Sequence, residues 1–165
     1  HGLPALAKTK LEHASTLAGL LMKTIQRISF SISPSMLDEF GLTDTVEWLC
    51  KEFSILNGIP CSFTSNYKEE KLSLEIKTDF FRICQESLSN VMYHAQAENV
   101  SISILEEKNT ISLMISDDGK GFDLNQQKPS AGLISMRERA ASINALLHIQ
   151  SDTGNGTTIK VTVEK

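Results

Sequence analysis

Apolar residues recur at intervals of three and four in four segments of the chain, and this spacing predicts helices. The first segment carries apolar residues on more than one side, so it needs a packing partner. Whether that partner is its own domain or the other half of a dimerising helical hairpin stays open. N-caps are expected at Thr43 or Asp44 and at Thr78 or Asp79, whose side chains accept hydrogen bonds from free N–H groups. The predicted helices cover residues 5–32, from the turn at 41–44 to about 56, 78–95 and about 133–144.

Alternation of apolar and polar residues predicts strands in much of the remaining chain. Two strands form a hairpin around Asn109, and two more pair across the loop at 152–156. The charged stretch 68–71 is interpreted as a solvated surface. The predicted strands are residues 60–64, 100–105, 111–116, 147–150 and 158–163.

The order of these elements predicts an α/β (α+β) fold. Helix, strand, helix, two strands, helix and two strands follow one another, and antiparallel hairpins alternate with helices. This order favours a two-layer sandwich in which helices cover one face of a mixed, mainly antiparallel sheet. A long N-terminal helix precedes the sandwich.

Composition narrows the possible functions. A chain of 165 residues that is 41% hydrophobic can bury a core. Its 16 basic and 20 acidic residues leave no excess positive charge, so nucleic acid is not expected as a partner. No apolar stretch reaches the roughly 20 residues of a membrane helix, and no signal-peptide pattern is present. Cys50, Cys61 and Cys84 lack metal-binding spacing, so no zinc site is expected and they are predicted to be reduced and buried.

One predicted helix carries three polar residues at intervals of four. Glu86, Asn90 and His94 therefore lie along one face, beside the apolar stripe. An amide oxygen can coordinate Mg²⁺, which prefers oxygen ligands. A carboxylate one turn away can act as a general base. A polar stripe of this kind is also typical of an ordinary solvated helix surface, and the spacing alone leaves both interpretations open.

Two glycine-containing segments are further candidates. Asp117, Gly119 and Gly121 directly follow a predicted strand, where glycine allows the backbone to approach a ligand closely. Gly132 opens a helix whose free N–H groups favour phosphate oxygens, and the polar loop 123–131 before it could serve as a lid. The alternatives are an ordinary turn and a linker into an amphipathic helix.

The order of these clusters, with Gly156-Thr157 opening the last strand, resembles the ATP-binding domain shared by sensor histidine kinases, gyrase-type ATPases and Hsp90-type chaperones. The resemblance covers about residues 34–163 and implies the Bergerat fold of that superfamily. Within it, the chain is most similar to sensor histidine kinases of the nitrate-sensor and thermosensor subfamily. Residues 85–95 resemble that subfamily's N box, and 132–139 resemble its second glycine box.

The resemblance implies a role for each matching residue on the predicted helix. Asn90 would hold a Mg²⁺ ion that bridges the phosphates of ATP. Glu86 would be the base that prepares the attacking histidine. His94 would lie near the phosphates.

The resemblance also assigns roles to the loop residues. Asp117 would accept a hydrogen bond from the adenine amino group, and Thr157 would support that contact. Gly119 and Gly121 would let the backbone pass close to the base. The remaining pair, Gly132 and Leu133, would contact the phosphates and close the lid.

Two positions depart from the subfamily's pattern. Ser130 stands where the second glycine box often has a glycine, and Asp118 stands where the first commonly has asparagine. The Asp118 carboxylate is expected to point outward, away from a nucleotide.

The resemblance implies two domains. Residues 1–33 would be the second helix of a dimerisation hairpin, and 34–165 the catalytic domain. The chain would be a protein-histidine kinase domain that transfers the γ-phosphoryl group of Mg-ATP to a histidine. In the subfamily, an acidic residue typically follows the acceptor histidine. Neither His1 nor His13 is followed by one, so that acceptor is expected upstream of this chain.

The partners implied are ATP, the phosphoacceptor helix of the parent kinase and a response regulator, with a homodimer in the full-length protein. The location implied is the cytoplasmic portion of a membrane-associated sensor. Two alternatives remain: a nucleotide-binding scaffold without catalysis, and an anti-sigma-type serine kinase domain.

Overall fold

The computed structural model describes residues 7–17, 34–124 and 130–165. The chain divides into two compact units, residues 1–33 and 34–165. In the first unit, residues 7–17 are helical, and the rest of the predicted helix lies outside the described residues. Within the described ranges, no helix combines the length and apolar character needed to cross a bilayer.

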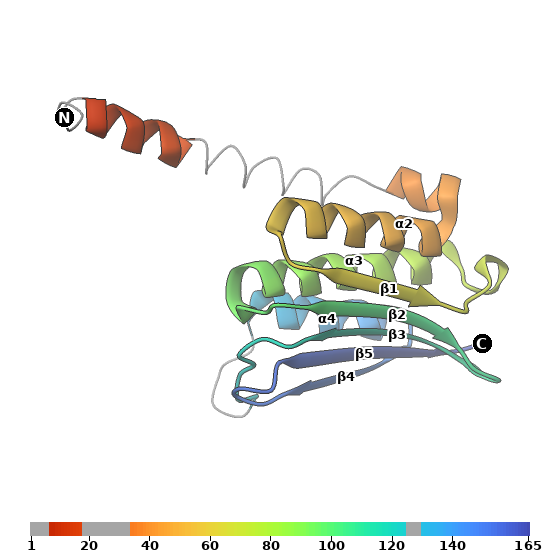
Figure 1. Ribbon diagram of the computed structural model, residues 1–165. Helices are drawn as coiled ribbons and strands as arrows, with labels where there is room; N and C mark the ends of the chain where they lie inside the picture. The colour runs from red at the N-terminus through yellow and green to blue at the C-terminus, as the bar shows by residue number, and fades with distance from the viewer. Residues whose placement is uncertain (1–6, 18–33, 125–129) are drawn as a thin grey trace. The chain divides into compact units, whose positions relative to one another are not determined.

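The second unit is built on a five-stranded sheet in the order β1-β2-β3-β5-β4 (Figure 1). The edge strand β1 runs parallel to β2, and the other neighbours pair antiparallel. The predicted mixed, mainly antiparallel sheet is therefore confirmed. The strands are β1 Cys61–Ser65, β2 Val100–Glu106, β3 Thr110–Asp117, β4 Leu146–Ser151 and β5 Thr157–Glu164.

Helices cover one face of this sheet (Figure 1). Strand β2 shows how the sequence selects that face: Val100, Ile102 and Ile104 are buried, while Ser101 between them is exposed. Because successive side chains of a strand point to opposite faces, alternation places Val100, Ile102 and Ile104 toward the helices and leaves Leu105 exposed on the other face. The covering helices are α2 Pro34–Asn57, α3 Leu74–Asn90, its π-helical continuation η2 Val91–Ala95, and α4 Ala131–Ser142.

Helix α3 begins earlier than its sequence pattern predicts. Its N-cap is Ser73, whose hydroxyl accepts a hydrogen bond from the N–H of Ile76 at 3.3 Å. The expected caps were wrong: Thr78 and Asp79 lie inside the helix, and Asp79 is buried. The helix therefore gains a full turn at its N-terminus.

The cysteines are free thiols, as predicted. Cys50 and Cys84 are buried, and Cys61 is half-buried at the start of β1. Burial raises the pKa of the Cys84 thiol and keeps it in its neutral form.

Helix α2 contains a kink whose cap comes from a distant residue. At Gly41 the backbone leaves helical geometry, with φ 79° and ψ 178°, and a new helical start follows. The N–H groups of Leu42 and Thr43, which have no partner within the helix, donate to the Glu69 carboxylate at 3.0 and 2.6 Å. The predicted caps at Thr43 or Asp44 were therefore wrong, and Glu69 is not simply solvated surface.

Glu69 lies in the short 3-10 helix η1 Glu69–Lys71 and also pairs with Lys77 at 3.0 Å. Burial by itself would raise the pKa of Glu69, but the N–H groups of Thr43 and Leu42 and the Lys77 ammonium outweigh it, so this pKa is lowered. A carboxyl whose pKa is lowered by folding stabilises the fold above its unfolded pKa. That stability is lost as pH falls through the lowered folded value.

We expect Glu69→Ala to lower the free energy of unfolding by about 1–2 kcal/mol at pH 7, because it removes the cap of the second segment of α2. Urea unfolding followed by circular dichroism measures this change. The difference from wild type should shrink as pH falls through the lowered pKa of Glu69. The exposed Glu107→Ala is the matched control, and equal stability of the two variants would contradict this account of the cap.

Candidate functional site

A cavity of about 400 Å³ lies between helix α3 with η2, strands β3 and β5, and the start of α4. Its volume suits a small-molecule ligand. Among the residues predicted for a site, six line this cavity: Asn90, His94, Asp117, Gly121, Leu133 and Thr157. The other three predicted residues do not line the cavity but lie beside it: Glu86, Gly119 and Gly132.

The helical wall of the cavity is formed where α3 becomes η2. Asn90 ends the α-helix, and His94 lies in the π-helical turn that follows. A π-helical turn is frequently found at functional sites. The turn ends at Gln96, whose φ of 54° is left-handed, and the chain then enters β2. Asn90 and His94 therefore face the cavity from the last turns of one continuous helical segment.

Strands β3 and β5 bring the next pair of residues together. Asp117 ends β3 and lies opposite Thr157, which begins β5. The Asp117 carboxylate accepts a hydrogen bond from the N–H of Gly119 at 2.9 Å. Burial raises the pKa of Asp117, and this outweighs the N–H groups of Gly119 and Thr157, which favour the charged form. The site thus holds a half-buried acceptor beside the hydroxyl-bearing Thr157.

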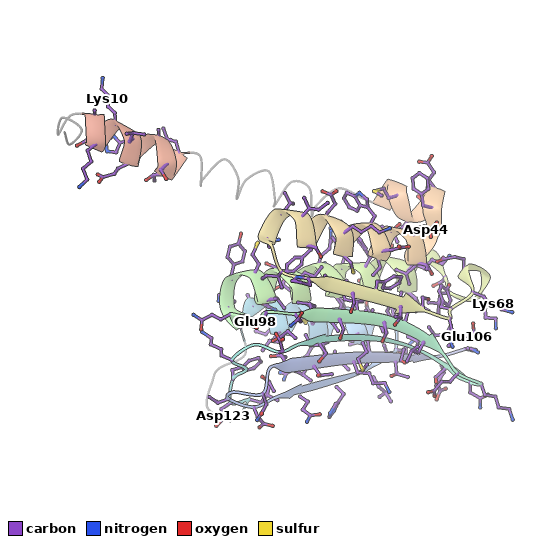
Figure 2. All side chains as sticks on the ribbon, viewed as in Figure 1. Lys10, Asp44, Lys68, Glu98, Glu106 and Asp123 are labelled. Carbon is purple, nitrogen blue, oxygen red and sulfur yellow. The ribbon has the colours of Figure 1, made fainter. Side chains whose placement is uncertain are left out.

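Asp118 points away from this cavity, as predicted. Its side chain is exposed and accepts hydrogen bonds from the N–H groups of Glu98 and Asn99, both at 2.8 Å, and from the Asn99 amide at 2.9 Å. The Asn99 side chain and these N–H groups lower the pKa of Asp118. Asp118 therefore ties the turn before β2 to the end of β3. Figure 2 labels Glu98 at this end of the sheet.

The glycine loop after β3 passes between two other backbone segments. The N–H of Lys120 donates to the carbonyl of Ala95 at 2.8 Å, and its carbonyl accepts from the N–H of Gly154 at 2.6 Å. A Cβ at Gly119 would overlap the carbonyl of Ala95, and one at Gly121 would overlap backbone at the β4–β5 turn. Glycine at these two positions allows the loop to pack between η2 and the β4–β5 turn. This packing requires glycine whether or not a ligand is bound nearby.

The start of α4 forms the opposite wall. Ser130 is its N-cap, with φ −65°, and its hydroxyl accepts from the N–H of Leu133 at 3.3 Å. Serine therefore adopts the required backbone without glycine geometry. Leu133 lines the cavity, whereas Gly132 faces α3: a Cβ there would overlap the Glu86 carboxylate. Part of the predicted lid, residues 125–129, lies outside the described residues.

Besides Ser130, several residues that were not predicted for a site also line the cavity. Arg137 is the most informative, because it is cationic, exposed and one helical turn beyond Leu133. That interval of four could have identified it, since residues four apart share a helix face. The other lining residues that were not predicted are Ser87, Val91, Ala95, Ile115, Lys120, Phe122, Leu124 and Ile159.

A second hollow of about 270 Å³ lies where β1 and β2 begin and β3 ends, and Asp117 lines it as well as the larger cavity. Serines 62, 101 and 116 line it together with Asp118. Across the parts of the chain that the structure describes, no group of three or more His, Cys, Asp or Glu side chains could hold a metal ion by itself.

Residues 75–165 match the family described as histidine kinase-, DNA gyrase B-, and HSP90-like ATPase. The chain belongs to this family. Membership makes ATP the ligand of the domain. The matched segment starts in α3 and runs to the C-terminus, so it contains every element that surrounds the cavity.

Curated relatives are sensor kinases. The chain is 34% identical over 140 residues to the signal transduction histidine-protein kinase/phosphatase DegS of Brevibacillus brevis, covering 84% of this chain and 36% of DegS. It is 32% identical to the sensor histidine kinase MctS of Rhizobium johnstonii, over 87% of this chain and 32% of MctS. The oxygen sensor histidine kinase NreB of Staphylococcus carnosus is 30% identical, over 87% of this chain and 42% of NreB. The chain thus spans a third to two fifths of these relatives.

Solved structures confirm the fold class. The histidine kinase domain of the blue-light activated histidine kinase from Erythrobacter litoralis matches with a TM-score of 0.61 at 15% identity, over 74% of this chain and 60% of that one. The catalytic domain of the histidine kinase ThkA matches with a TM-score of 0.58 at 14% identity, over 78% of this chain and 93% of that one. The predicted Bergerat-type sandwich is therefore confirmed.

We expect Asp117→Asn to abolish the preference for adenine nucleotides while stabilising the empty protein. A raised folded pKa means that the charged carboxylate costs stability at neutral pH, because this group favours folding only below its unfolded pKa. An amide removes that cost but places an N–H₂ donor where the exocyclic amine of adenine is expected to bind. Isothermal titration with ATP and GTP, together with thermal melts without ligand, measures both changes.

Wild-type affinity for ATP should also weaken as pH falls through the raised pKa of Asp117, since protonation removes an acceptor. Asp152→Asn, an exposed carboxylate at the β4–β5 turn, is the control. An Asp117→Asn variant that still discriminates ATP from GTP as the wild type does would refute the adenine contact.

Proposed function

We propose that residues 34–165 are the ATP-binding catalytic domain of a sensor histidine kinase, which transfers the γ-phosphoryl group of Mg-ATP to a histidine outside this chain. One observation carries the proposal. In a chain of this ATPase family, the Asp117–Thr157 end of the sheet, the Asn90–His94 turns and the start of α4 converge on one cavity. The sensor kinases DegS, MctS and NreB support the choice of a histidine kinase.

The cavity offers different chemistry at its two ends. At the sheet end, Asp117 accepts from the adenine amino group and Thr157 supports it, while Ile115 and Ile159 supply apolar surface for the base. At the helical end, His94 and Arg137 offer cationic or donor groups to the phosphates. Net charge is therefore not needed for anion capture, which explains how a chain of net charge −4 binds ATP.

The residues present fit a Mg²⁺ ion that is held jointly with ATP. Asn90 offers one amide oxygen to the cavity, and Mg²⁺ is commonly bound by few protein ligands plus phosphates and waters. When bound, the ion neutralises negative charge on the phosphates. The protein's own contribution is to fix the Asn90 side chain at the end of α3, opposite the start of α4.

Glu86 is the proposed base that prepares the incoming histidine. Its carboxylate lies one turn before Asn90 on α3 and against Gly132 of α4, beside the cavity and not within it. From there it can accept a proton from an imidazole that approaches from outside the domain. Gly132 leaves room for this carboxylate because glycine has no Cβ.

The first unit, residues 1–33, is proposed as the second helix of a dimerisation hairpin, whose partner helix carries the acceptor histidine. The described helix at 7–17 supports a helical assignment. A response regulator and a homodimer of the full-length protein complete the proposed pathway. The location proposed is the cytoplasmic portion of a membrane-associated sensor.

Mg-ATP should stabilise the chain against heat. At 100 times its dissociation constant, a ligand adds about 2.7 kcal/mol to the free energy of unfolding. For a domain of this size that raises Tm by roughly 5–10 °C. Asn90→Ala should retain part of the shift with ATP alone but lose the increment that Mg²⁺ adds, which differential scanning fluorimetry measures.

Asn109→Ala, in the exposed β2–β3 turn at the other end of the sheet, is the control and should respond as the wild type does. No shift of wild type with millimolar ATP or ADP would overturn nucleotide binding. An unchanged Mg²⁺ increment in Asn90→Ala would overturn the metal assignment.

The full-length protein that contains this chain should incorporate label from γ-³²P-ATP that is acid-labile and alkali-stable, as expected for phosphohistidine. Glu86→Gln should lower the labelling rate by about 100-fold or more without weakening ATP binding, because it removes a general base. Glu107→Gln is the control. Acid-stable label on serine would favour the serine-kinase alternative, and bound ATP without any label would favour a scaffold.

A further inference from the structure

Helices α3 and α4 pack antiparallel in a defined register. Asp79 of α3 pairs with Arg139 of α4, and Glu86 of α3 lies against Gly132 of α4. Seven residues separate the two positions on each helix, about 10.5 Å at 1.5 Å per residue. The interval between the two contacts is thus the same on both helices. One contact is the charged pair of Asp79 and Arg139, and the other is the Glu86 carboxylate against Gly132, beside the cavity.

The charged end is built from a buried carboxylate and the last turn of α4. The Arg139 guanidinium donates to Asp79 Oδ1 at 2.8 Å, and the Ser142 hydroxyl lies 3.1 Å from Oδ2. Each carboxylate oxygen therefore has its own partner on α4. Only 12% of the Asp79 side chain is exposed, so water does not replace these partners readily.

Helix α4 has three faces with different contacts. Met136 and Ala140 are buried against the domain core. Leu133 and Arg137, one turn apart, face the cavity. Gly132 and Arg139 face α3, as the contacts above show. A slide or rotation of α4 along α3 would therefore move Leu133 and Arg137 relative to Asn90 and Glu86.

We propose that Asp79 is a positioning residue for the phosphate end of the nucleotide site, acting through Arg139 and Ser142 to fix the register of α4. This inference rests on the proposed function and adds a residue that touches no part of the cavity. The sequence alone suggested a helix cap at Asp79. In the structure it lies two turns from Glu86 on the same helix face and holds the opposite wall of the site in place.

Binding at the adenine end of the cavity serves as an internal reference, because the positioning role of Asp79 should not affect it. Asp117, Thr157, Ile115 and Ile159 belong to β3 and β5, and their pairing does not involve α4. Loss of the Asp79 contacts should therefore weaken binding of the triphosphate while adenosine binds as before. A merely structural role would lower stability and leave the ratio of the two affinities unchanged.

The experiment measures dissociation constants for Mg-ATP and for adenosine by isothermal titration, in wild type, Asp79→Asn, Arg139→Lys and Ser142→Ala. Asp79→Asn should raise the constant for Mg-ATP by about tenfold, a size typical of coupling between contacting residues. The constant for adenosine should change less than about twofold. Arg139→Lys, which keeps the charge, and Ser142→Ala, which keeps the ion pair, should have smaller effects in the same direction.

Glu106→Gln is the matched control for lost stability. Only 11% of its side chain is exposed, and it pairs with Lys71 and Lys165 at the end of β2 remote from Asp117 (Figure 2). These cations hold the pKa of Glu106 at about 2, so this carboxylate is also a charged structural anchor. Its loss should lower Tm and leave the ratio of ATP to adenosine affinity unchanged.

The outcomes separate this inference from the proposed function. If wild type binds neither ligand, the proposed function fails. If wild type binds both and Asp79→Asn changes the two constants by the same factor, the positioning role is overturned. If Asp79→Asn does not fold, Ser142→Ala carries the test, and an unchanged ratio of affinities in that variant overturns the inference.

Discussion

The close packing of α3 against α4 is the constraint on which the site depends. Glycine at position 132 removes the side chain that would otherwise overlap the Glu86 carboxylate. Two turns away, the pair of the buried Asp79 and the partly exposed Arg139 fixes how far α4 slides along α3. The cavity lies beside this interface, between the two helices and the sheet.

The sheet supplies the other fixed boundary. Pairing of β3 with β5 places Asp117 opposite Thr157 and leaves the carboxylate half-buried at the strand end. The glycine loop then threads between Ala95 and the β4–β5 turn, which couples this strand end to the π-helical turn that carries His94. The proposed function assigns the base to the strands and the phosphates to the helix ends.

Local sequence patterns predicted the features of the fold and site that depend on neighbouring residues. Alternation identified the strands, because each side of the sheet has its own solvent environment. Asp117 was recognised from its position after a strand, and Asn90 and His94 from their spacing of four on one helix face. The cavity brings the three together. Glu69 and Asp79 were misassigned for a common reason: their partners lie 26 and 60 residues away in sequence. No local pattern distinguishes a carboxylate that caps a distant helix from one in solvent.

The most direct test of the central claim is an amide NMR titration of this chain with Mg-ATP, because it locates binding residue by residue. The account predicts that the largest shifts fall on residues 90–95, 117–121 and 157 and on the first turn of α4, while Glu106 and Thr110 at the far end of the sheet stay unchanged. Shifts confined to Ser62 and Ser101, at the second hollow, would contradict it.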